Sequence, residues 1–129
     1  MSTPHLPPEV LLPPRPERVT PLLADLGVAG GHRLVLLSLE VWDGWADLRF
    51  ARIDEGADRP LPRRVPPAGS WQVRVDGQAV EVLDAVGRGD RAFSNGEVRL
   101  RPAVAAGSSL HVRVEVTPGS PPLETTVEV

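Results

Sequence analysis

The segment Arg33 to Asp54, RLVLLSLEVWDGWADLRFARID, constrains the fold more than any other part of the chain. Asp43-Gly44 lies at its centre, and Asp-Gly between alternating apolar residues is the strongest short-range signal for a β-hairpin, because a type I′ turn needs positive φ at both central residues. With these two residues as the loop, Trp42 pairs with Trp45. The segment therefore predicts a two-stranded antiparallel ribbon.

Strict alternation gives this ribbon one apolar face, which we expect to point into the core. Its members are Val35, Leu37, Leu39, Val41, Ala46, Leu48 and Phe50. The other face is polar near the turn, with Ser38, Glu40, Asp47 and Arg49. A slip of one residue would exchange the two faces, so the pattern also predicts the register, with Leu37 opposite Phe50 and Val35 opposite Arg52.

Further turn signals extend the strand pattern in both directions. Gly30-Gly31 predicts a hairpin that joins a first strand, Arg18 to Ala29, to the ribbon, and it sets Leu26 opposite Val35. Asp76-Gly77 predicts another hairpin, across Trp71 to Leu83. Polar turns are expected at Gly87 to Asp90 and at Asn95-Gly96. The later alternating runs predict strands at 97–101, 110–117 and 123–129.

These patterns predict an all-β protein with essentially no helix, an immunoglobulin-like antiparallel β-sandwich of seven or eight short strands. Residues 1–17 are rich in proline and predict a flexible tail; residues 18–129 predict a single β-sandwich domain. The PxxP pattern at Pro13 to Pro16 is read as part of this tail, with docking into an aromatic groove as the alternative. Residues 55–69 predict a long connection between sheets.

The composition of the chain argues against several classes of function. The net charge of −3 and the pI near 5.6 give no long-range attraction to nucleic acid or to anionic lipid. The chain has no cysteine, so it has no disulfide, thiolate metal site or cysteine nucleophile. No window is apolar enough for a membrane span, and the first residues do not resemble a secretory signal. We therefore expect a cytoplasmic protein.

No catalytic or cofactor motif is present. The three histidines, His5, His32 and His111, are not spaced as metal ligands. The acidic residues from Asp54 to Asp58 allow a calcium site, but they lack a loop motif and are read as a solvated turn. Arg88-Gly89-Asp90 is likewise read as a turn and not as an adhesion tripeptide. We expect no enzyme activity and no cofactor.

The ribbon supplies the candidate binding residues. Trp42 and Trp45 stabilise a hairpin as a cross-strand pair, and exposed Trp is also enriched at binding hot spots. In the predicted register Leu34, Leu36 and Ile53 lie on the outward side at the far end of the ribbon and form an apolar patch. The patch is covered either by the Pro-rich segment or by a partner. The function predicted is a non-enzymatic protein-interaction module, and the alternative is structural self-association through the same patch.

The segments RVTPLLADLGVAGG and LVLLSLEVWDGWADLRF, followed by WQVRVDG, GEVRLRP and LHVRVEV, resemble immunoglobulin-like modules of high-GC bacterial proteins of unknown function. The absence of lysine agrees with this composition, since all 14 basic residues are arginine. The resemblance rests on strand pattern and turns, and it covers most of residues 18–117. It implies a fold and leaves the activity open, and the two core cysteines of antibody domains are missing.

Overall fold

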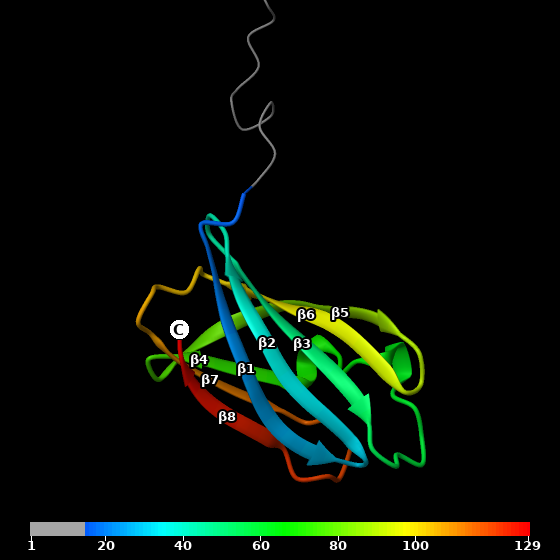
Figure 1. Cartoon of the computed structure of the whole chain (residues 1–129). Coiled ribbons are helices and arrows are strands. Elements are labelled where there is room, and N and C mark those ends of the chain that lie inside the picture. Colours follow the sequence, from blue (N-terminus) through cyan, green and yellow to red (C-terminus); the bar gives the residue numbers. More distant parts are fainter. Residues whose placement is uncertain (1–14) are drawn as a thin grey trace, which may run out of the picture.

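The computed structural model describes residues 15–129, which form antiparallel β-strands with two short 3-10 helices (Figure 1). The strands are β1 (Arg18–Ala29), β2 (His32–Val41), β3 (Ala46–Asp54), β4 (Trp71–Val75), β5 (Gln78–Gly89), β6 (Phe93–Arg101), β7 (Ser109–Val114) and β8 (Leu123–Glu128). The helices η1 (Pro62–Arg64) and η2 (Ala68–Ser70) lie in the long connection between β3 and β4. The predicted all-β class is confirmed.

The eight strands are ordered β1-β2-β3-β6-β5-β4-β7-β8 in one antiparallel sheet that curls into a barrel-like shape. The long strand β5 connects the two halves of the curled sheet. Its first residues pair with β4, and the part from Glu81 onward pairs with β6. The edge strands β1 and β8 come close together, and no ladder pairs join them within residues 15–129. The architecture is thus barrel-like, and it does not divide clearly into the two sheets of an immunoglobulin sandwich.

The three predicted hairpin turns are all present. Gly30 and Gly31 both have positive φ (58° and 79°), as do Asp76 and Gly77 (49° and 80°), which fits the type I′ requirement. At the central hairpin only Gly44 has positive φ. This turn is therefore not type I′, although it reverses the chain where predicted and keeps the pairs Val41–Ala46 and Leu39–Leu48.

A β-bulge at Leu37 changes the ribbon beyond those pairs. The register shifts between Leu36 and Ser38, so that Leu36 faces Phe50 and Leu34 faces Arg52. Because a bulge inserts one unpaired residue, the side chains beyond it exchange faces. The predicted pairs of Leu37 and Val35 with β3 are therefore wrong: both residues are half-buried, whereas Leu34 and Leu36 are completely buried.

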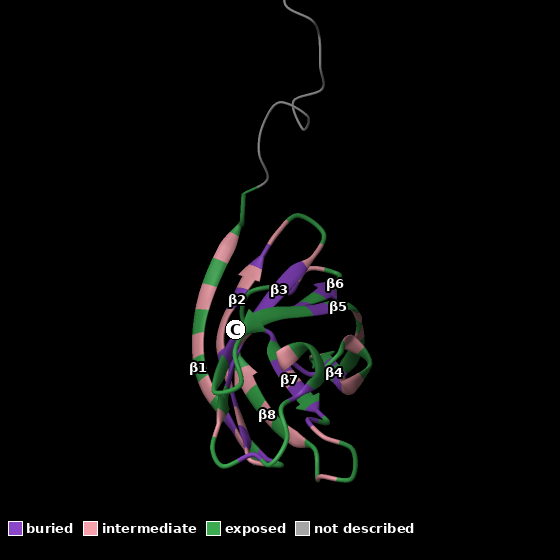
Figure 2. Cartoon of the chain, turned by 90° about the vertical axis from the view of Figure 1, so that its right-hand side faces the viewer, coloured by how far each residue is buried: buried purple, intermediate pink, exposed green. Residues whose placement is uncertain are grey.

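The first strand also departs from simple alternation. Its register with β2 shifts between Pro21 and Ala24 and again between Asp25 and Gly27. The predicted opposition of Leu26 and Val35 is therefore wrong, since Asp25 faces Val35 instead. Figure 2 shows β1 as alternating exposed and half-buried segments along one side of the barrel.

Asn95-Gly96 is part of β6 and not a turn, so that prediction is wrong. Gly96 lies opposite Gly87 of β5 and opposite Phe50 of β3. A Cβ at Gly96 would overlap the carbonyl oxygen of Val86 and lie 2.9 Å from the Phe50 ring. Glycine is required here for close packing, which is the other structural use of this residue within strands.

The predicted turn at Gly87 to Asp90 is also misplaced, because Gly87 to Gly89 belong to β5 and the chain reverses at residues 90–92. Arg88-Gly89-Asp90 therefore spans the end of a strand and the start of a turn. The Asp90 carboxylate accepts the backbone N–H groups of Ala92 and Phe93, at 2.8 and 3.0 Å. Its side chain thus stabilises the turn.

The core lies inside the barrel and draws on every strand except β8, whose Leu123 and Val127 pack against it from the edge. Its fully buried large side chains include Leu34, Leu36, Leu39, Leu48, Phe50, Leu100 and Leu110. Phe50 packs against Trp71, with ring centroids 4.8 Å apart. No helix among residues 15–129 has the length and hydropathy needed to cross a membrane.

Candidate interaction surfaces

The two tryptophans of the central hairpin form a stacked pair. The ring centroids of Trp42 and Trp45 are 5.6 Å apart and their planes differ by 3°. The backbone N–H of Trp42 donates to the carbonyl oxygen of Trp45 at 2.8 Å, which holds the two residues across the reversal. Both side chains are half-buried. The structure thus brings these two predicted site residues together, and we call them the Trp tip.

An ion pair supports the Trp tip from β3 and β6. The Asp47 carboxylate, only 4% exposed, accepts Nε and Nη2 of Arg99 at 2.9 and 3.1 Å. The guanidinium carbon of Arg99 lies 5.4 Å from the ring centroid of Trp45, within the range of a cation–π contact. These hydrogen bonds, followed by the nearby negative charges, raise the pKa of Arg99. Arg99 thereby fixes the position of Trp45 relative to the sheet.

Both indole Nε1–H groups of the Trp tip are buried and have no hydrogen-bond acceptor within residues 15–129. A buried donor without an acceptor costs about 1–3 kcal/mol. Such groups are rare in native structures and call for a physical explanation. The stacked rings therefore hold two unused donors directly beside the solvent-facing hairpin.

A groove of about 290 Å³ runs beside the tip. It is lined by Asp43, Gly44, Trp45, Leu83, Arg99 and Arg101. Leu83 is 39% exposed, and Arg101 is paired with Glu81 at 2.8 Å. The groove therefore joins an aromatic ring, an exposed aliphatic side chain and two guanidinium groups.

The other predicted site residues are not gathered into one patch. Leu34 and Leu36 are 0% exposed and belong to the core, so their predicted outward position is wrong; the bulge at Leu37 is the reason. Ile53 is 36% exposed on β3, as predicted. It lies at the end of β3 opposite the Trp tip, beside Phe93 of β6, which is 46% exposed.

Near that opposite end of β3 the structure holds a buried arginine. Arg52 is 0% exposed, and its guanidinium donates to the carbonyl oxygens of Arg64 (2.9 Å), Arg91 (3.0 Å) and Asp90 (2.7 Å). It also donates to Oγ of Ser94 at 3.0 Å. Burial is the main cause that lowers the pKa of Arg52. No carboxylate among residues 15–129 contacts it within ion-pair distance.

His32 completes this group of buried polar side chains. Its Nδ1 lies 3.4 Å from Nη1 of Arg52, and its Nε2 lies 3.0 Å from the carbonyl oxygen of Arg59. A guanidinium donates and a carbonyl accepts, so the two contacts fit a donor at Nε2 and an acceptor at Nδ1. We call Arg52, His32 and Ser94 the Arg52 hub. It attaches the 55–69 connection and the 90–92 turn to the barrel.

Sequence reasoning missed the Arg52 hub. The predicted register already placed Arg52 on the same side as Phe50, which was the available signal, but a charged residue was not expected among core positions. From the sequence, His32 is expected only to follow the Gly30-Gly31 turn. The acceptors of the hub are backbone carbonyls from distant segments, and residue types do not reveal such partners.

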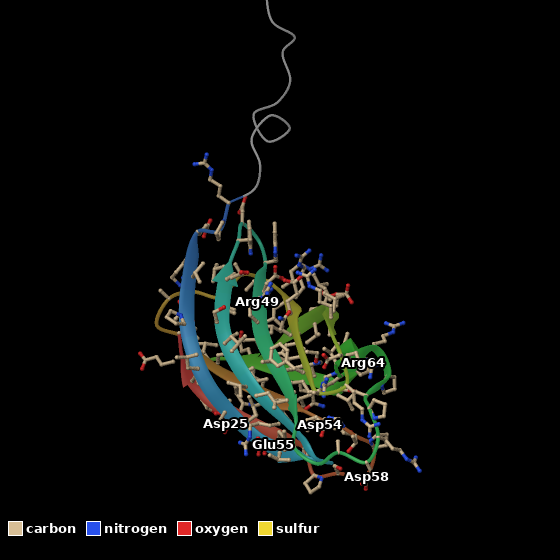
Figure 3. All side chains as sticks on the ribbon, turned by 45° about the vertical axis from the view of Figure 1, so that its right-hand side comes forward. Asp25, Arg49, Asp54, Glu55, Asp58 and Arg64 are labelled. Carbon is tan, nitrogen blue, oxygen red and sulfur yellow. The ribbon has the colours of Figure 1, made fainter. Side chains whose placement is uncertain are left out.

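The acidic residues near Asp54 serve local structure. The Asp54 carboxylate accepts the backbone N–H of Ala57 at 2.7 Å. Glu55 and Asp25 both pair with Arg33, at 2.6 and 2.5 Å. Figure 3 labels these two acidic residues at the same end of the barrel. Within residues 15–129 no three His, Cys, Asp or Glu side chains are grouped as metal ligands.

Comparisons with protein-family models, with curated proteins and with solved structures give no match for this chain. The function is therefore argued from the geometry of the surfaces alone.

Proposed function

We propose that this protein is a non-enzymatic protein-interaction module that binds a partner protein through the Trp tip and its groove. The observation that carries the proposal is the stacked pair Trp42–Trp45, whose indole donors have no acceptor within residues 15–129 and whose Trp45 ring lines a groove with exposed Leu83. Trp and Arg are enriched at binding hot spots, where they pair with pockets on a partner. The tip offers both residue types on a supported scaffold.

The geometry favours a partner segment with an apolar side chain and backbone carbonyls. The aliphatic side chain would cover Trp45 and Leu83, and the carbonyls would accept hydrogen bonds from Arg101 and, after a small opening of the tip, from the indoles. Arg99 is already engaged by Asp47, so its role is to hold the ring. The interaction would cost little reorganisation, because the groove borders paired strands.

The immunoglobulin-like relationship and the cytoplasmic location remain part of this proposal. The first is supported by the alternating strands and by the change of partner along β5, which separates a ladder containing β6 from a ladder containing β4. The second is supported by the sequence features given above. Neither determines which partner binds.

The test is the double variant Trp42→Ser/Trp45→Ser, compared with the wild type in affinity capture from the native lysate at two salt concentrations. We expect the variant to lose specific partners while its melting stays cooperative. The matched control is Val19→Ser/Leu23→Ser, which removes two exposed apolar side chains from β1 and leaves the tip intact. If the tip variant captures the same partners as the control, the proposed site is wrong.

Self-association is a second candidate function. The exposed side chains of β1 favour it, whereas the predicted patch does not form because Leu34 and Leu36 are buried. Along this edge strand Val19, Leu23 and Val28 are 56%, 77% and 40% exposed. An unpaired edge with apolar side chains is a template for pairing with a second copy. Sedimentation at several concentrations tests it: a monomer at all concentrations excludes this function, and a dimer lost in Val19→Ser/Leu23→Ser supports it.

A further inference from the structure

The outer face of β3, β6 and β5 carries a second surface, away from the Trp tip. The ladder registers align its outward side chains in rows across the three strands. Ile53 lies beside Phe93, and Asn95 lies beside Arg88. The next row toward the tip contains Arg49, Glu97 and Val86.

This face is hollowed where two glycines lie opposite each other. Gly87 pairs with Gly96, and the depression around them has a volume of about 300 Å³. The residues that line it are Arg49, Val86, Gly87, Arg88, Asn95, Gly96 and Glu97. That volume is at the lower limit of ligand pockets, about 300–1,000 Å³, so the hollow suits one or two side chains better than a cofactor. We call it the β5–β6 hollow.

The charge of the hollow favours a carboxylate. Arg49 makes a single 3.3 Å contact with Glu97, which leaves its other donors available. Arg88 is exposed, and no ion pair or side-chain hydrogen bond engages it within residues 15–129. Two guanidinium groups and one carboxylate, that of Glu97, therefore line the hollow, together with the amide of Asn95, which lies opposite Arg88 on the neighbouring strand. Arginine binds carboxylates in a bidentate geometry.

Exposed apolar side chains flank these charges. Val86 is 45% exposed, and Phe93 and Ile53 at the end of the face are 46% and 36% exposed. An aromatic and aliphatic surface beside arginine is the composition enriched in protein interfaces. The hollow thus offers a carboxylate site with apolar contacts on either side.

We propose that the β5–β6 hollow binds a short acidic and apolar segment of a partner polypeptide. A Glu or Asp side chain enters between Arg49 and Arg88, and neighbouring apolar side chains cover Val86 and Phe93. A polypeptide fits better than nucleic acid or an anionic membrane. The whole chain is negative (−3), so it repels an extended polyanion, whereas a single carboxylate senses mainly charges within about one Debye length, ~8 Å.

The test measures fluorescence anisotropy of a labelled peptide of about six residues in which Leu, Glu and Leu stand at alternate positions, so that these three side chains share one face of an extended strand; we call it the Glu–Leu peptide. The full chain should bind it at low salt and more weakly at high salt. Arg88→Glu should weaken binding at least tenfold. The matched control is Arg113→Glu, an equal change of charge at an exposed position of β7, and it should bind like the wild type.

A charge exchange makes the test specific. The variant Arg49→Glu/Arg88→Glu should bind the corresponding Lys–Leu peptide better than the wild type does, and Phe93→Ser should weaken binding of the Glu–Leu peptide. Equal binding by Arg88→Glu and Arg113→Glu would overturn the proposal. So would tighter binding of a DNA duplex or of phosphatidylserine vesicles than of the Glu–Leu peptide.

This surface is separate from the proposed function of the Trp tip, and the two can fail independently. The variant Trp42→Ser/Trp45→Ser should bind the Glu–Leu peptide normally. Loss of peptide binding in that variant would place the peptide at the tip and exclude the hollow.

Discussion

The two ends of β3 are built in opposite ways. At the start of the strand, the Trp tip is formed by neighbours in sequence, and its half-buried rings are held by one ion pair, Asp47–Arg99. Near the end of the strand, Arg52 is completely buried and binds carbonyl groups from residues 64, 90 and 91. Within residues 15–129 the two indole donors of the tip have no acceptor, whereas each guanidinium nitrogen of Arg52 has at least one.

The comparison shows that the Trp tip is suited to binding, whereas the Arg52 hub holds parts of the structure together. Once the tip opens, indole donors that have no acceptor within residues 15–129 can bind a partner, while the completely buried guanidinium of Arg52 is out of reach of a ligand. The hub instead determines where the 55–69 connection and the 90–92 turn lie. Substitutions at the hub should therefore change stability, and substitutions at the tip should change binding.

The largest expected effect is at the hub. Arg52→Met keeps most of the side-chain volume but leaves the carbonyl oxygens of Asp90 and Arg91 without their donor. A hydrogen bond to a charged group contributes about 1.5–3 kcal/mol, so the variant, which loses two of them, should lose about 3–5 kcal/mol of unfolding free energy in urea denaturation. The matched control is Arg74→Met, at an exposed position of β4, and it should change the unfolding free energy by about 0.5 kcal/mol or less.

Equal stability of Arg52→Met and Arg74→Met would contradict the structural role of the Arg52 hub, and with it the distinction between the two ends of β3. Faster proteolysis within residues 55–69 in Arg52→Met would sharpen it, because the carbonyl oxygens of Arg59 and Arg64 link that connection to the hub. Proteolysis follows local opening when the chain segment loses its anchoring contacts.

The sequence predicted well those features that depend on neighbouring residues. Three hairpin positions and the all-β class follow from glycine-bearing turns and alternation, and all are confirmed. Trp42 and Trp45 were predicted as a cross-strand pair because the turn brings them together. The hub was not predicted, since its partners lie 12 to 42 residues from Arg52.

At the bulge at Leu37, the alternation of apolar residues is no longer sufficient to predict the register of β2 with β3. Both Leu36 and Leu37 are apolar, so alternation alone does not say which one is the extra residue. The core decides, because with Leu37 as the extra residue Leu34 and Leu36 are buried opposite Arg52 and Phe50. Similarly, Gly96 has the residue type of a turn and serves close packing against Phe50.

The second prediction tests the position of this bulge, which lies between the Trp tip and the Arg52 hub. Leu36→Ala should lose about 2–5 kcal/mol, the range for deleting a fully buried leucine side chain. Leu37→Ala, at the half-buried bulge position, should lose about 1 kcal/mol or less. The urea midpoints of the two variants give the comparison. Strict alternation predicts the reverse order, so a less stable Leu37→Ala would contradict the observed register.

The smallest effect concerns pH at the hub end. Hydrogen bonds from the backbone N–H groups of Phe93 and Ala92, and then the charges of Arg52 and Arg64, lower the pKa of Asp90. A lowered folded-state pKa stabilises the protein above the ordinary Asp value, about 3.9, and this contribution is lost as the pH falls through the folded-state value. Asp90→Asn should remove it, so the stability difference between wild type and variant should be constant near neutral pH and shrink in acid.

High salt distinguishes the causes of that pH dependence. Salt screens the charges of Arg52 and Arg64 at exposed Asp90, but it has little effect on the short bonds from Phe93 and Ala92. Most of the difference between wild type and Asp90→Asn should therefore persist at about 1 M salt, where the Debye length is ~3 Å. Its disappearance would mean that charge, and not the turn, determines the state of Asp90. The hub end would then depend on electrostatics as the Trp end does through Arg99 and Asp47.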